Sequence, residues 1–78
     1  MTNQNALRLA DQTILQLRRN KYVRAVWIVH GFGIVRTPNC DDEVARMIEM
    51  GADLVGVFGP DAQRQDLAEA IVETAAGA

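Results

Sequence analysis

Hydrophobic and polar residues follow two different periods along this chain. Between Tyr22 and Thr37, β-branched and aromatic residues stand on both sides of a short break that contains Gly31 and Gly33. Runs of this kind are typical of paired strands, and glycine supplies the positive φ angles that a tight hairpin turn needs. The stretch therefore predicts an antiparallel hairpin with strands over residues 23–29 and 34–36.

The segments around the hairpin have helical spacing. Residues 3–20 carry an apolar stripe at intervals of three and four, with Thr2 or Asn3 as the N-cap. A second helix is predicted after Pro38, with Asn39 or Thr37 as its cap, and Gly51 ends it. Residues 52–58 are predicted to form a short apolar strand without clean alternation, which favours a central position in the sheet or one covered on both faces. A last helix is predicted to begin at 59–61, with Asp61 as its cap, and to end at Gly77.

These elements predict an α+β fold of two layers in the order α-β-β-α-β-α. An antiparallel hairpin and a third strand form one small sheet, and helices pack on it. Because a helix joins the second and third strands, those two would be parallel if they were adjacent. In the first strand, Trp27 falls on the wholly apolar side and is expected in the core. Val26 and Ile28 lie in the middle of the other side, so that either a helix covers them or they form a contact surface.

Size and composition indicate a single globular domain over residues 1–78. The chain has 49% hydrophobic and 23% charged residues. A core of this size gives little spare stability, so that association with a partner or with a second copy would help. The single cysteine, Cys40, excludes an intrachain disulfide and fits a reducing compartment. No apolar run approaches the length of a membrane span, and we expect a cytoplasmic protein without membrane contact.

Charge is distributed unevenly along the chain. Residues 1–39 carry six Lys or Arg and one Asp, whereas residues 40–78 carry two Arg and nine Asp or Glu, giving +5 and −7. Two faces of opposite potential would result if the halves stay apart, and each could steer a different partner. The alternative is that the two halves attract each other within the fold.

The chain offers little for catalysis. It contains no serine, one histidine and one cysteine, which leaves Cys40 with His30 as the only nucleophilic pair. Cys40 falls on the apolar face of its predicted helix, where a buried thiol is the commoner outcome. The acidic residues 41–43 suit the positive end of a helix dipole, and their spacing is not that of a calcium loop. We expect no enzyme activity, no metal and no cofactor.

The leading hypothesis is a non-catalytic protein-binding module, a small accessory or regulatory protein that occupies a partner's surface. In size and composition it is similar to small phage-type inhibitors of nucleic-acid-handling complexes, such as host defence systems. Acids on the last helix would then act in place of phosphates against a basic groove. Leu15 is included because it lies off the apolar stripe of its helix. The predicted contact residues are Arg18, Arg19, Lys21, Arg24, Val26, Ile28, Leu15, Asp66, Glu69 and Glu73.

Two alternatives belong to other functional classes. One is nucleic-acid binding by the basic segment 18–24, where Arg and Lys could contact phosphates. The other is a small ligand-binding or enzymatic domain that uses the loop 30–33. That loop lacks the third glycine of a dinucleotide fingerprint, since Arg36 stands at the required position. A homodimer is a further expectation for the partner.

Overall fold

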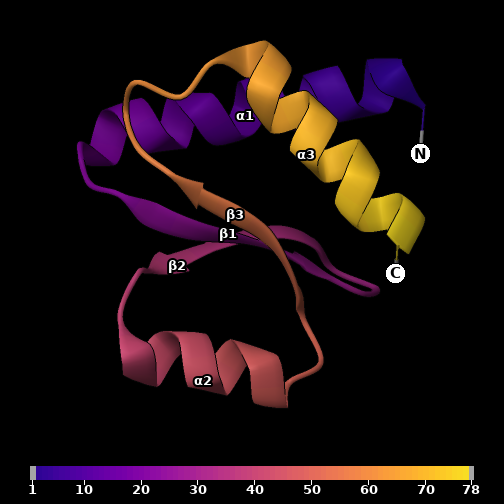
Figure 1. The fold of residues 1–78 in the computed structure, drawn as a ribbon. Helices are drawn as coiled ribbons and strands as arrows, with labels where there is room; N and C mark the ends of the chain where they lie inside the picture. Colours follow the sequence, from indigo (N-terminus) through magenta and orange to yellow (C-terminus); the bar gives the residue numbers. More distant parts are fainter. Residues whose placement is uncertain (1, 78) are drawn as a thin grey trace.

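A three-stranded sheet lies at the centre of the computed structural model, which describes residues 2–77 (Figure 1). The elements follow each other as α1 (Asn3–Asn20), β1 (Arg24–Val29), β2 (Gly33–Pro38), α2 (Asp41–Glu49), β3 (Asp53–Phe58) and α3 (Arg64–Gly77). The strand order is β2-β1-β3, and both pairs are antiparallel. The predicted α+β class and the order of elements are confirmed.

The helices cover both faces of the sheet. α1 and α3 pack together on one face, where a cluster of buried residues from these two helices contacts Ile34, Val55 and Phe58 of the strands. α2 lies on the opposite face, as Figure 1 shows, and its Met47 is buried with Ala25 and Trp27. The sheet is therefore the middle of three layers, not half of the two-layer arrangement that we expected. Both faces of β1 are apolar because helices cover both.

The predicted hairpin is present. β1 and β2 are antiparallel neighbours, and Val35 lies opposite Trp27. Gly31 and Gly33 have φ angles of 80° and 128°, which the turn requires and which a side chain would disfavour. β2 is longer than predicted and ends at Pro38. Proline is tolerated there because β2 is an edge strand.

β3 occupies a different place from the expected one. It pairs with β1, so that β1 separates β2 from β3 and no parallel pair forms. The prediction that this strand is central or covered on both faces is wrong, since β3 is an edge strand. Leu54 and Val57 are 50% and 48% exposed because the buried cluster beneath α2 consists of residues from β1, β2 and α2 and from the segment before β3.

The N-terminal cap predicted from the sequence is present at α1 but not at α2 or α3. Thr2 Oγ1 accepts a hydrogen bond from the backbone N–H of Asn5 at 3.2 Å, as an N-cap should. α2 begins one residue after Cys40, which provides no side-chain cap. α3 begins at Arg64, so Asp61 is not its cap. A turn from Gly59 to Ala62, closed by a 3.0 Å backbone hydrogen bond, delays the start of α3.

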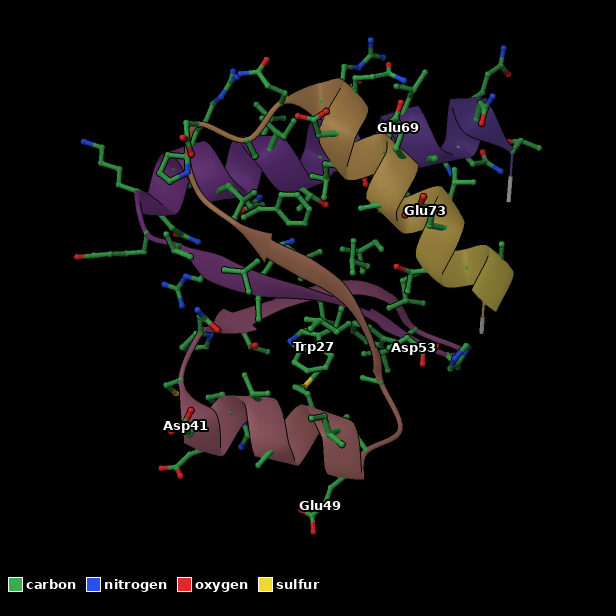
Figure 2. All side chains as sticks on the ribbon, viewed as in Figure 1. Trp27, Asp41, Glu49, Asp53, Glu69 and Glu73 are labelled. Carbon is green, nitrogen blue, oxygen red and sulfur yellow. The ribbon has the colours of Figure 1, made fainter. Side chains whose placement is uncertain are left out.

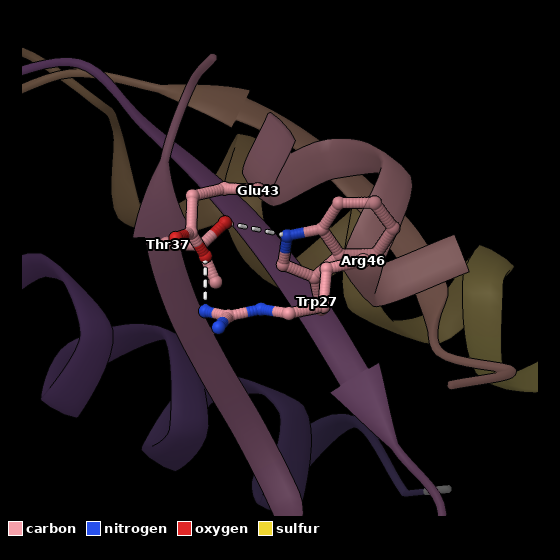
Figure 3. Close-up of polar contacts among 4 residues, drawn as sticks. All are labelled: Trp27, Thr37, Glu43 and Arg46. Carbon is pink, nitrogen blue, oxygen red and sulfur yellow. Dashed lines mark hydrogen bonds and ion pairs between the residues drawn. The ribbon is translucent and has the colours of Figure 1, made fainter. Parts of the chain in front are cut away.

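Trp27 is the largest side chain that the fold encloses. It is 1% exposed, and its indole N–H donates to Thr37 Oγ1 at 2.9 Å (Figure 3). Its predicted place in the core is confirmed. Thr37 was a candidate helix cap, but it lies in β2, where its hydroxyl accepts from Trp27.

Candidate functional site

A groove runs between the first turns of α1 and the middle of α3. Its volume is about 380 Å³. Four small or medium apolar side chains line it, two from each helix, namely Ala6, Leu7, Ala68 and Val72. The polar residues that line it are Asn3, Gln65, Glu69 and Glu73. A lining of this kind can bury apolar side chains, and its two carboxylates can pair with cations.

The two glutamates of the groove lie on one side of α3. Glu69 and Glu73 are four residues apart, so they project from the same side of the helix one turn apart, and both are exposed. Figure 2 shows them on α3, across the sheet from Asp41 and Glu49 of α2. Gln65 Nε2 donates to Glu69 Oε1 at 3.4 Å, which continues this polar row toward the start of the helix. The third predicted acid, Asp66, is exposed on α3 but does not line the groove.

Small residues let α1 and α3 pack closely beneath this groove. Ala6, Ala10 and Ala68 are almost fully enclosed, as are the larger Leu67 and Ile71. Alanine contributes no long side chain that would fill the space between two helix surfaces. The groove is therefore a product of helix packing, with the acids held at fixed spacing on a rigid element.

The uneven charge of the chain is not neutralised by ion pairs between its two halves. Within residues 2–77, no Lys or Arg of the first half pairs with an acid of the second half. Arg64 of the acidic second half pairs with Asp11 of the basic first half at 2.7 Å, so each half contributes its minority charge to this ion pair. Most of the acidic and basic side chains thus remain available to solvent and to a partner.

The basic residues lie around the end of α1 and the start of β1. Arg18, Arg19 and Lys21 are exposed, and the two arginines occupy the last turn of α1, where cations complement the helix dipole. Arg24 is half-buried, and its guanidinium carbon lies 5.8 Å from the centroid of the Tyr22 ring. The enclosed Nε of Arg24 has no hydrogen-bond partner in the described part of the chain.

The three predicted apolar contact residues have different surroundings. Leu15 is 67% exposed on α1, as its position off the apolar stripe predicts. Val26 is fully buried, and Ile28 is half-buried. Of the two explanations for these strand residues, the covering helix holds, so Val26 is not available to a partner. Because side chains alternate between the two faces of a strand, Val26 and Ile28 both lie on the sheet face that α1 and α3 cover.

The single nucleophilic pair that the composition allows does not form. His30 stands three positions before the first residue of β2, whereas Cys40 stands two positions after the last residue of the same strand. Six residues of strand separate them by about 20 Å. Cys40 is exposed, contrary to the prediction, because it precedes the helix in an extended conformation and does not share its apolar face. Over residues 2–77, no group of three His, Cys, Asp or Glu side chains is arranged to hold a metal ion.

Two surface features escaped the sequence analysis. His30 Nε2 lies 2.6 Å from Asp53 Oδ2, which ties the hairpin turn to the start of β3. Several large hydrophobic residues are exposed at sites where periodicity suggested burial or gave no signal, among them Phe32 in the turn, Ile48 in α2, and Leu54 and Val57 in β3. The pairing of His30 with Asp53 depends on the strand order, which local sequence does not encode.

Comparison with known proteins identifies no relative. No protein-family model matches the chain, and the same holds for curated proteins and solved structures. Within residues 2–77, none of the helices combines the length and the apolar character that crossing a membrane requires.

Proposed function

We propose that this chain is a non-catalytic protein-binding module, a small accessory or regulatory protein that acts by occupying a partner's surface. The observation that carries the proposal is the groove between α1 and α3, with its apolar lining and with Glu69 and Glu73 one helical turn apart. The unequal charge of the two halves of the chain adds to the support, since within residues 2–77 no Lys or Arg of the basic half pairs with an acid of the acidic half.

The chemistry of the groove selects a cationic partner segment. Alanine, leucine and valine side chains can bury an apolar stripe, and the two carboxylates can pair with Lys or Arg side chains that flank it. Basic surfaces of this kind are common in proteins that handle nucleic acids. The acids of α3 would then stand where phosphates normally bind, and the module would inhibit its partner by competition. A nucleic-acid-handling complex of a host defence system is one such target for a phage-type protein.

Loss of the groove charges tests this function against a matched control. The tagged chain is used to capture proteins from cells that produce it, and the captured partner is then titrated with purified variants. Glu69→Gln/Glu73→Gln removes two charges from the groove. Asp41→Asn/Glu49→Gln removes two charges from α2, on the other side of the sheet. We expect the groove variant to bind at least about tenfold more weakly and the control to bind as the unchanged chain does.

Two results would contradict the proposal. One is equal affinity of both double variants for the captured partner. The other is the absence of any protein retained above the level of an untagged control. The low cysteine content fits a reducing compartment, and we place the interaction in the cytoplasm.

A second candidate function is nucleic-acid binding by the basic end of α1. The contact of Arg24 with the Tyr22 ring favours it, since an aromatic face and guanidinium groups together can stack on bases and pair with phosphates. Fluorescence anisotropy of a labelled single-stranded oligonucleotide at low salt tests this reading. No change at high micromolar protein would exclude it.

A further inference from the structure

The outer edge of β3 is unpaired. In the described part of the chain, β3 has β1 as its neighbour in the sheet and no strand on its other side. Within residues 2–77, none of the backbone hydrogen bonds of turns, loops and caps reaches a residue of β3. The outward N–H and C=O groups of this strand therefore lack backbone partners, which makes the edge a template for a further strand.

Two half-exposed hydrophobic side chains accompany this edge. Leu54 lies opposite Trp27 and Val57 lies opposite Ala25, so both project from the sheet face that carries α2. Residues three apart would normally point to opposite faces of a strand. An irregularity in the pairing of β3 with β1, between Val26 and Trp27, brings Leu54 and Val57 to the same face. The exposed fractions of 50% and 48% leave an apolar strip along the free edge.

The other edge of the sheet does not share these features. β2 ends in Pro38, which has no backbone N–H, and it carries the charged Arg36. No large hydrophobic residue of β2 is exposed. Only β3 combines an unpaired edge with exposed apolar side chains.

We propose that β3 pairs with β3 of a second copy of this chain, antiparallel about a twofold axis perpendicular to the sheet. An axis between Val55 and Gly56 places Leu54 opposite Val57 of the second copy, and the reverse pair forms by symmetry. The two sheets then become one continuous sheet, and the unpaired edges disappear. Backbone hydrogen bonds supply the affinity, and the apolar pairs fix the register.

The charges at the two ends of β3 complement each other in this arrangement. Arg24 of β1 lies beside Phe58 at one end, and Asp53 is the first residue at the other end. Antiparallel pairing brings the Asp53 end of each copy to the Arg24 end of the other. Arg24 and the second copy's Asp53 then stand two strand spacings apart, about 10 Å between Cα atoms, within reach of an arginine side chain. Oδ2 of Asp53 also lies 2.6 Å from His30 Nε2 of its own chain, so Arg24 would join an existing polar contact. From their positions in the strand register, the side chains of Arg24 and Asp53 both lie on the sheet face that α1 and α3 cover.

Sedimentation velocity over a range of protein concentrations tests the pairing, with circular dichroism as the check on folding. The 8.6 kDa chain should shift toward twice its mass as the concentration rises. Leu54→Lys/Val57→Lys opposes two cations across the interface and should raise the dimer Kd by at least about tenfold. Leu15→Lys, at a leucine that is also exposed but lies on α1, should leave the Kd unchanged.

Hydrogen exchange on the unchanged chain locates the interface. The outward-pointing amides of residues 54–57 should become protected from exchange as the dimer forms. This result does not depend on whether the substituted chains fold. A chain that stays monomeric at every concentration would overturn the proposal. So would a dimer that leaves the β3 amides unprotected, or one that Leu15→Lys weakens as much as the double substitution does. The proposal does not depend on the groove between α1 and α3, since Glu69 and Glu73 take no part in it.

Discussion

Trp27 Nε1 donates a hydrogen bond to Thr37 Oγ1 at 2.9 Å, in the interior between the sheet and α2 (Figure 3). Thr37 lies opposite Ala25, so the two partners are diagonal neighbours on one sheet face. The contact lets the chain bury its largest side chain without leaving the indole N–H unsatisfied. It also links the middle of β1 to the end of the β2 edge strand.

Thr37→Val should destabilise the protein because it keeps the side-chain shape and removes the acceptor. An unsatisfied buried donor costs about 1–3 kcal/mol, and we expect the free energy of unfolding to fall by that amount. Urea denaturation followed by Trp27 fluorescence measures it. Thr37→Ser keeps the hydroxyl and serves as the control. If the valine variant were as stable as the serine variant, the hydrogen bond would contribute little.

Leu17 and Leu15 form a matched pair on α1. Leu17 is fully buried, whereas Leu15 is 67% exposed. Leu17→Ala should lower the free energy of unfolding by about 2–5 kcal/mol because it leaves a cavity in the core. Leu15→Ala should change it by less than about 0.5 kcal/mol. Chemical denaturation of both variants measures the difference, and similar losses would mean that the exposed side of α1 is assigned wrongly.

Gly56 is required by the approach of Phe58. A Cβ atom at residue 56 would lie 3.0 Å from Cε2 of the Phe58 ring, and the φ angle of 156° is one that side chains rarely adopt. Gly56→Ala should therefore destabilise the fold by about 1–3 kcal/mol. Gly77→Ala, at a glycine with open space around it, should leave the melting temperature unchanged or slightly raised. Thermal unfolding of the two variants compares them directly, and equal melting temperatures would contradict the strain at Gly56.

The ion pair of Arg64 with Asp11 should contribute little to stability. The two side chains are 56% and 50% exposed, so solvent screens their attraction. A double-mutant cycle with Arg64→Gln and Asp11→Asn should give a coupling energy of at most about 1 kcal/mol, and it should decrease as salt is added. A larger coupling that salt does not change would show that this pair fixes the start of α3 against α1.

Local sequence determined the parts of the fold that depend on neighbours along the chain. The cap at Thr2 and the apolar stripe of residues 3–20 defined α1, since a helix closes its hydrogen bonds within four residues. Gly31 and Gly33 defined the hairpin for the same reason. The exposure of Leu15 followed from the helical period. The acids of α3 could be predicted to lie on an outer face, although the groove that two of them line could not.

Only the tertiary structure decided the strand order and the coverage of each face. β3 pairs with β1 across 25 or more residues of chain, and no residue pattern within either strand specifies that choice. The same pairing leaves Leu54 and Val57 exposed, brings His30 to Asp53, and puts α2 opposite α1 and α3. Side chains that are far apart in sequence meet through packing, so the burial of Val26 and the groove beside Glu69 follow from how the layers assemble. The hydrophobic pattern shows which residues must be covered, but the assembled layers determine what covers them.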